Sequence, residues 1–174
     1  MSCAINLTQG FALDCKDSVG GIKSISLIDW VADGFTTASG EVTAIAATGV
    51  VTSGSTYTYE LPKGVGSMTI TTNVSAENGT VFNQTDVVGR LRKLSTAKRN
   101  ELKLLSQSRV FAIVRDNNDN YYLVGKEYGC DITALTGETG TAMGDLNGYN
   151  FTLSAIEAEA PYKLQSSVVT SLGI

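Results

Sequence analysis

Histidine is absent from this 174-residue sequence, and that absence removes whole classes of chemistry. Without histidine the chain cannot build Ser-His-Asp or Cys-His nucleophile systems, and it lacks the commonest metal ligand. The sequence also lacks a Gly-Lys-Ser/Thr phosphate-binding loop and a G-x-S-x-G nucleophile turn. We therefore expect a protein that is not an enzyme and that holds no cofactor or metal ion.

Cysteines are few and long apolar runs are missing. The three cysteines, Cys3, Cys15 and Cys130, lack the CxxC spacing of metal and redox sites, and we interpret them as reduced intracellular thiols. The start of the chain has no basic region followed by an apolar core, so we expect no signal peptide. No segment approaches the ~20 apolar residues that a membrane-spanning helix needs, and we expect no membrane partner.

Short runs of Val, Ile, Thr and Tyr, interrupted by Gly and Asn, are the main positive feature. Apolar residues make up 43% of the chain and charged residues only 17%, with 18 glycines and 2 prolines. This composition is typical of an all-β protein, and the length suits one domain with its own core. We predict a mainly β sandwich or barrel at 22–162, an N-terminal arm at 1–21 and a partnerless C-terminal tail at 163–174. Within the domain, 42–51 predicts a weakly specified single strand or a strand pair.

The stretch 66–94 predicts an unusually long hairpin. Asn78-Gly79 separates two alternating arms, and Asn-Gly is the strongest signal for a type I′ turn, in which both central residues have positive φ. Each arm is roughly twice the usual strand length. Thr, Ser, Asn and Gln fill one face of the ribbon, which suits a surface facing water or a wet channel. We expect other copies of the chain to complete its open edges.

A basic segment follows the hairpin. Ser95 is a suitable N-cap for one short helix at 95–107. Residues 90–109 include seven basic and one acidic residue, a net charge of +6 in a chain of −4, so the other residues sum to −10. This segment could be a solvated helix face, a nucleic-acid site, or a surface that binds the acidic part of the next subunit, which we favour. The predicted self-assembly residues are Arg90, Arg92, Lys93, Lys98, Arg99 and Lys103.

Acidic residues offer two weaker candidates for chemistry. The spacing of a calcium-binding loop occurs at Asp116, Asn118, Asn120 and Glu127. Tyr121, however, stands where such a loop needs glycine, so we predict the tip of a second hairpin instead. Glu157 and Glu159 fall on one face at the end of a predicted strand, as a carboxylate pair of a glycoside hydrolase could, but nothing else in the sequence supports catalysis.

The order of elements resembles the tail-tube class of bacteriophage proteins: several strands, a long hairpin, one short helix, a second hairpin and a last strand before Pro161. Short stretches of the sequence are similar to virion structural proteins of phages and prophages of Bacteroides-type bacteria. The similar stretches are MSCAINLTQGFALDCKDSVGGIKSI, VSAENGTVF with LRKLSTAKRNELKLL, and GDLNGYNFTLSAIEAEAP, together about a third of the chain. No contact residue is carried over from the family.

The resemblance implies a β-sandwich whose strands join those of sibling copies in a barrel around a channel. The implied assembly is a homo-oligomeric ring, expected to be hexameric and stacked, in a virion tail assembled in the host bacterial cytoplasm. The implied partners are other tail proteins, and DNA that passes through the lumen without specific binding. We therefore expect the basic segment to lie outside the lumen. The alternatives are another virion ring or a capsid decoration protein, and a small ligand-binding β-barrel.

Overall fold

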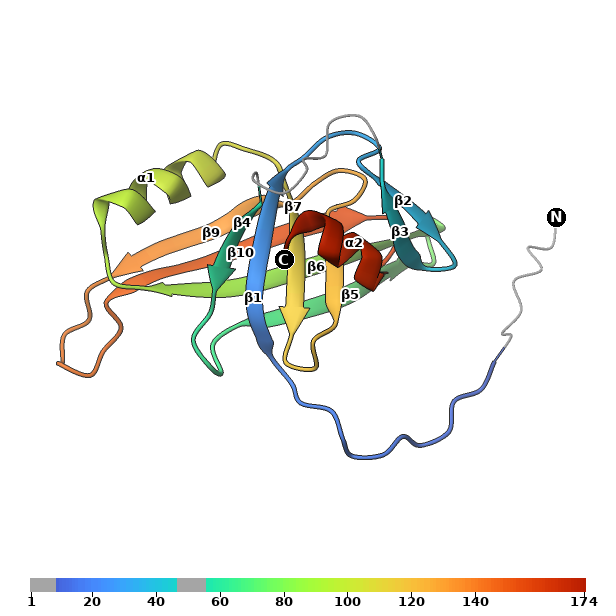
Figure 1. The fold of residues 1–174 in the computed structure, drawn as a ribbon, viewed down its shortest axis with the longest axis horizontal. Coiled ribbons are helices and arrows are strands. Elements are labelled where there is room, and N and C mark those ends of the chain that lie inside the picture. Colours follow the sequence, from blue (N-terminus) through green and yellow to red (C-terminus); the bar gives the residue numbers. More distant parts are fainter. Residues whose placement is uncertain (1–8, 47–55) are drawn as a thin grey trace.

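Two β-sheets packed face to face form the body of the protein (Figure 1). The computed structural model describes residues 9–46 and 56–174. The elements in chain order are β1 Ile22–Asp29, β2 Phe35–Ala38, β3 Glu41–Ile45, β4 Tyr57–Glu60, β5 Ser67–Ser75, β6 Thr80–Arg92, α1 Thr96–Leu105, β7 Val110–Asp116, β8 Tyr121–Val124, β9 Asp131–Glu138, β10 Gly148–Glu157, β11 Tyr162–Leu164 and α2 Ser166–Leu172. The predicted mainly β sandwich is confirmed. The sheets do not close into a barrel, and the described chain has two helices where we predicted one.

The larger sheet has seven strands in the order β2-β3-β11-β8-β7-β1-β4. Strand β7 lies inside it, and its first five residues, VFAIV, are all buried. Such an unbroken apolar run is expected for a strand that is covered on both faces. Phe111 and Ile113 face the cluster that includes α2, whereas Ala112 and Val114 face the smaller sheet.

The smaller sheet has four antiparallel strands in the order β5-β6-β10-β9. Its strands cross those of the larger sheet steeply in Figure 1, as in orthogonally packed sandwiches. Phe151, Leu153 and Ala155 alternate along β10 and point into the shared core. Gly89 of β6 makes room for Phe151, because a Cβ atom at this position would lie 2.4 Å from the phenyl ring.

The C-terminal segment belongs to the body, contrary to our prediction of a tail without a partner. Strand β11 pairs in parallel with β3 and antiparallel with β8. Helix α2 then buries Val168 and Leu172 against the larger sheet. These two residues are four positions apart, which places them on one helix face, so the pattern was present in the sequence but only seven residues long.

The predicted long hairpin is confirmed, but its predicted turn type is wrong. Strands β5 and β6 pair from Ser67 with Val88 to Ser75 with Thr80. This register leaves a four-residue loop, 76–79, in which Gly79 has a positive φ of 63° and Asn78 does not. Loops of this length are most often built around a type I turn rather than a two-residue type I′ turn.

Residues 9–20 fall within the predicted arm, and they form an extended segment that leaves the body (Figure 1). Every one of them is exposed. Contacts within the described part of the chain hold the root of the arm: the backbone of Val19 exchanges two hydrogen bonds with the side chain of Asn118, and the Asn117 amide donates to the Gly20 carbonyl. Cys3 and residues 47–51, the second half of the strand predicted at 42–51, lie outside the described residues, whereas most of the first half belongs to β3.

Candidate assembly surface

The outward face of the four-stranded sheet is largely polar, and we call it the polar face. It lies opposite the side that packs on the larger sheet. The pairing registers place on it Ser67, Thr69, Thr71, Asn73, Ser75, Phe82, Gln84, Asp86, Val88, Arg90, Arg92, Asp131, Ala134, Thr136, Glu138, Asn150, Thr152, Ser154 and Ile156. Hydroxyl and amide groups dominate this set, so the face is well suited to contact water over its whole width.

Both edges of this sheet are open among the described residues, because no described strand pairs with the outer side of β5 or β9. Strand β5, SMTITTNVS, has nine residues with no charge and no proline. Charges and prolines are the usual means by which proteins keep an edge strand from pairing with another chain. Strand β9 has acidic residues only at its two ends. Neither edge is well protected against strand addition.

Strand direction makes the two edges complementary. Neighbouring strands alternate in direction across β5, β6, β10 and β9. With four strands, β5 and β9 therefore run in opposite directions. When identical copies stand side by side in the same orientation, β5 of one copy meets β9 of the next in the antiparallel sense. This is a heterologous contact, which generates a ring if the rotation closes.

The base of the hairpin packs into the shared core, but its tip extends beyond the core. Met68 and Val87, near the hairpin base, pack into the shared core. Ile70, Val74 and Val81 lie on the same side toward the turn, yet they are 45%, 69% and 59% exposed. Within one chain β6 is completed by β10, so our expectation that the whole hairpin needs another copy was too broad. The outer edge of β5 and the apolar tip are the parts left open.

The predicted basic residues occupy two places rather than one. Arg90 and Arg92 extend from β6 onto the polar face. The side chain of Arg90 donates a 2.8 Å hydrogen bond to Asn150, whose amide donates to Glu138 at 2.8 Å. This chain of contacts crosses three strands and brings a carboxylate close to the arginine. Side chains alternate between the two faces along β6, and this alternation places Arg90 and Arg92 on the polar face. A count of charges along the sequence does not show which face they occupy.

The other four basic residues lie at or after the junction between β6 and α1. Lys93 adopts a positive φ of 67° at the junction, and Lys98 donates to the carbonyls of Arg92 and Lys93. Arg99 and Lys103 are exposed on α1. Both ion pairs among the described residues involve Asp119 rather than any of the six predicted cations. None of the six predicted cations therefore forms an ion pair with an acidic residue within the described part of the chain.

The predicted second hairpin is confirmed, with β7 and β8 paired around residues 117–120. The Asp116 carboxylate accepts hydrogen bonds from the backbone N–H groups of Asn118 and Asn120, at 2.8 and 2.7 Å. Burial raises the pKa of Asp116, but these bonds and those from both amide side chains outweigh it and lower the pKa overall. The Asp116, Asn118 and Asn120 side chains, whose spacing resembled a calcium-binding loop, thus stabilise the turn of a hairpin.

Glu157 also has a structural role in the fold. Its side chain is buried, and one carboxylate oxygen accepts from the backbone N–H groups of Glu127 and Tyr128, at 2.6 and 3.2 Å. These two residues follow β8, so the carboxylate at the end of β10 ties the smaller sheet to the larger one. Glu159 is exposed beyond the end of β10. The two carboxylates therefore have different environments.

Comparison with profiles of known protein families, with curated proteins and with solved structures finds no match to this chain. No helix in residues 9–46 and 56–174 is long and apolar enough to cross a bilayer. The same residues contain no cluster of three or more His, Cys, Asp or Glu side chains that could hold a metal ion. The open four-stranded sheet is therefore the feature from which function is inferred.

Proposed function

We propose that this chain is a tail-tube-like virion subunit. In this proposal its four-stranded sheet joins those of sibling copies edge to edge, so that stacked rings enclose a channel for DNA. The subunit is structural and catalyses no reaction, and its further partners are other proteins of the virion tail. The observation that carries the proposal is the pair of unprotected, oppositely directed edge strands on a single sheet.

Closure of a ring explains why such edges would be retained. A long, flat, uncharged edge strand on a monomer invites uncontrolled aggregation. Pairing β5 of each copy with β9 of the next satisfies both edges of the four-stranded sheet, as in other closed β structures. The contact also brings a neighbour next to the hairpin tip, where Ile70, Val74 and Val81 are exposed. Cover for these side chains would add hydrophobic stabilisation to the backbone hydrogen bonds.

The polar face suits the inner wall of the channel. Hydroxyl and amide groups hydrogen-bond water and carry no formal charge. They therefore offer DNA phosphates no strong electrostatic attraction, and DNA could slide past them. Three acidic residues, Asp86, Asp131 and Glu138, share the face with Arg90 and Arg92. The hydrogen-bond chain from Arg90 to Glu138 weakens the pull of this arginine on phosphate. A wall of unpaired cations would instead hold the DNA in place.

Proline substitution on β5 tests the proposal. Successive residues of a strand point their N–H groups to opposite sides, so of Thr71→Pro and Thr72→Pro one loses a bond to β6 and the other loses a donor on the open edge. Thermal unfolding identifies the variant that keeps the fold. We expect that variant to lose the assemblies that the parent chain forms in negative-stain electron microscopy.

The appearance of the parent assembly decides between the virion alternatives. Stacked rings support the tail tube. Discrete rings or trimers favour a head-to-tail ring or a capsid decoration protein instead. A chain that stays monomeric at all concentrations, or a folded edge-proline variant that still assembles like the parent, contradicts the edge-to-edge proposal.

A further inference from the structure

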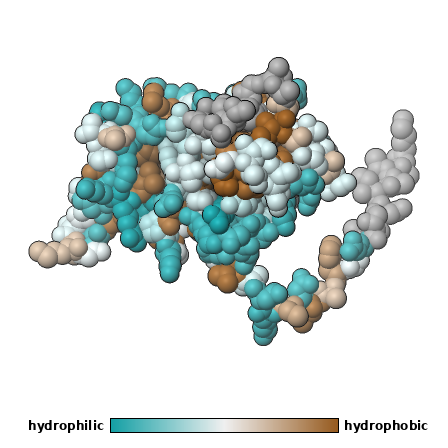
Figure 2. Space-filling view, viewed as in Figure 1, coloured by the Kyte–Doolittle hydropathy of each residue, from teal (hydrophilic) through white to brown (hydrophobic). Residues whose placement is uncertain are grey.

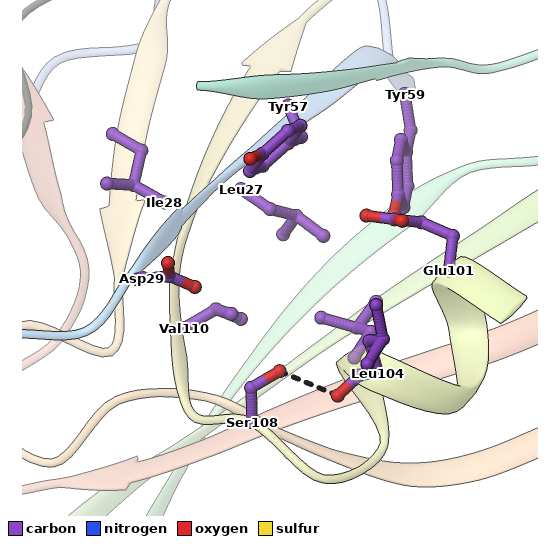
Figure 3. A pocket seen from close by; sticks show the side chains of 10 residues that line it. Leu27, Ile28, Asp29, Tyr57, Tyr59, Glu101, Leu104, Ser108 and Val110 are labelled. Atoms are coloured by element: carbon purple, nitrogen blue, oxygen red, sulfur yellow. Dashed lines mark hydrogen bonds between the residues drawn. The ribbon is translucent and has the colours of Figure 1, made fainter. Parts of the chain in front are cut away.

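A groove lies between helix α1 and the edge strand β4 (Figure 3). It consists of two hollows with volumes of about 240 and 500 Å³, and Tyr59 and Glu101 line both of them. Apolar surface is available in the first hollow, where Tyr57 and Leu104 are 52% and 61% exposed. The groove therefore has apolar and polar walls and follows an edge strand.

The edge strand beside this groove has backbone groups available for pairing. Strand β4 pairs only with β1 among the described strands, and the Leu61 N–H donates to the Lys23 carbonyl at 2.9 Å. Hydrogen-bond direction alternates along an antiparallel strand. The backbone groups of Thr58 and Glu60 therefore face the open side. An extended peptide can add here as a further strand, with side chains entering the groove.

The N-terminal arm has the pattern of a strand without a sheet. Phe11 and Leu13 are 91% and 101% exposed, which is an unusual position for two large apolar side chains. Together with Cys15 they alternate with Ala12 and Asp14, the period expected of a half-buried strand. The projecting arm with its apolar side chains is visible in Figure 2.

We propose that the arm of one copy docks in the α1–β4 groove of a second copy by adding a strand to β4. Phe11 then enters the smaller hollow beside Tyr57, and Leu13 lies beside Tyr59. The root of the arm favours a second copy, because Asn117 and Asn118 hold it at the turn between β7 and β8. That turn lies on the opposite side of β1 from β4 in the sheet order.

Charge sets the direction of the docked arm. Asp29 lies at the Tyr57 end of the groove, whereas Arg92 and Lys98, together with Glu60 and Glu101, line the hollow at the other end. A strand parallel to β4 carries Asp14 and Asp17, which flank Lys16, toward these cations. The reverse direction would place them near Asp29. The arm thus supplies acidic partners for basic residues that have none among the described residues.

A disulfide trap in the full-length chain tests this inference. The parallel register brings the native Cys15 beside Leu61, whose hollow Lys98 also lines. In a Cys3→Ser background, Lys98→Cys is oxidised with copper phenanthroline and analysed on a non-reducing gel. Lys103→Cys, exposed on the same helix but outside both hollows, is the matched control. We expect a covalent dimer with Lys98→Cys, its loss on adding Cys15→Ser, and none with Lys103→Cys.

Further variants keep every outcome informative. Arg92→Cys lines the same hollow and replaces Lys98→Cys if that variant does not fold. Phe11→Ser with Leu13→Ser should weaken arm-dependent association by at least about 100-fold, given the usual value of two buried apolar side chains. Equal cross-linking at both helix positions overturns the inference, and so does a monomer with an internal disulfide, which would show that the arm folds back on its own chain.

The docking inference concerns the β4 edge of the larger sheet, whereas the tail-tube proposal concerns the β5 and β9 edges of the smaller sheet, and the two can fail separately. An edge-proline variant that keeps the fold but loses rings should still give the cross-linked dimer. If the cross-link persists without rings in the parent chain, the tail-tube proposal fails alone. If rings form without any cross-link, the arm inference fails alone.

Discussion

Strands β7 and β5 show how differently the two sheets are used. Strand β7 has five consecutive buried residues, whereas β5 has no fully buried residue along its nine positions. Strand β7 lies between α2 and the smaller sheet, and it pairs with β1 and β8. Among the described strands, β5 pairs with β6 alone. Strand β7 therefore contributes mainly to the core, whereas β5 mainly presents a surface.

The difference teaches that exposure in the smaller sheet follows from topology rather than from weak strand propensity. Threonine, isoleucine and valine dominate β5, and all three favour strands. The chain thus maintains a well-formed strand where it has little to gain from intramolecular burial. An intermolecular use of that strand is a direct reason to maintain it.

The largest expected effect comes from the larger sheet. Phe111 is fully buried and packs edge-on against Phe35, with ring centroids 5.0 Å apart. Replacing it with alanine should lower the free energy of unfolding by about 3–5 kcal/mol. Phe82→Ala on the polar face, where the side chain is 38% exposed, is the matched control and should cost far less. Chemical denaturation measures both, and equal losses would erase the proposed division between the sheets.

The contact between the sheets comes next. Glu157→Ala leaves the N–H groups of Glu127 and Tyr128 without their acceptor in a buried site. We expect a loss of about 1–3 kcal/mol in the free energy of unfolding. Glu157→Gln retains an acceptor oxygen and should lose less, and Glu159→Ala, at an exposed position, should have little effect. If the two alanine variants are equally stable, the carboxylate does not join the sheets.

Much of the local structure could be predicted from the sequence because local rules govern it. Alternation predicted the long hairpin, and Ser95 does cap α1 by accepting a hydrogen bond from the Lys98 backbone N–H. The predicted turn type was wrong because Asn-Gly fits several loop lengths. The strand register, which depends on both arms, decides among these lengths. Helix α2 was missed because its sequence, SSVVTSL, is short and β-branched.

The candidate surface was less predictable, since it depends on which strands become neighbours. Counting charge predicted one basic block, but β6 carries Arg90 to the polar face while α1 carries Arg99 elsewhere. The groove beside β4 requires α1 to lie next to β4, although these elements are far apart in the sequence. Only the polar face of the hairpin could be predicted, because a period of two fixes which side chains share it.

The hairpin tip offers a smaller effect. Gly79 has a φ of 63°, and a Cβ at this position would meet no atom within 4 Å. Gly79→Val should therefore cost only the backbone strain of the left-handed region, about 1–2 kcal/mol. Asn78→Val is the control, because Asn78 has no positive φ. A larger loss for Asn78→Val than for Gly79→Val would restore the type I′ turn that the observed register replaces.

The smallest effect concerns Tyr59 in the groove, which links the two sheets through its edge-on contact with Phe151. Burial, followed by the nearby Glu101 carboxylate, raises the pKa of Tyr59 to about 12 from its ordinary value of 10.0. The folded chain therefore retains a proton that the unfolded chain releases. The associated stabilisation is complete below pH 10 and is lost as the pH rises toward 12. Thermal unfolding across this range should show a steeper decline for the parent than for Tyr59→Phe. Parallel declines would place the Tyr59 hydroxyl in water, and the groove would then be too wet to hold apolar side chains of a docked arm.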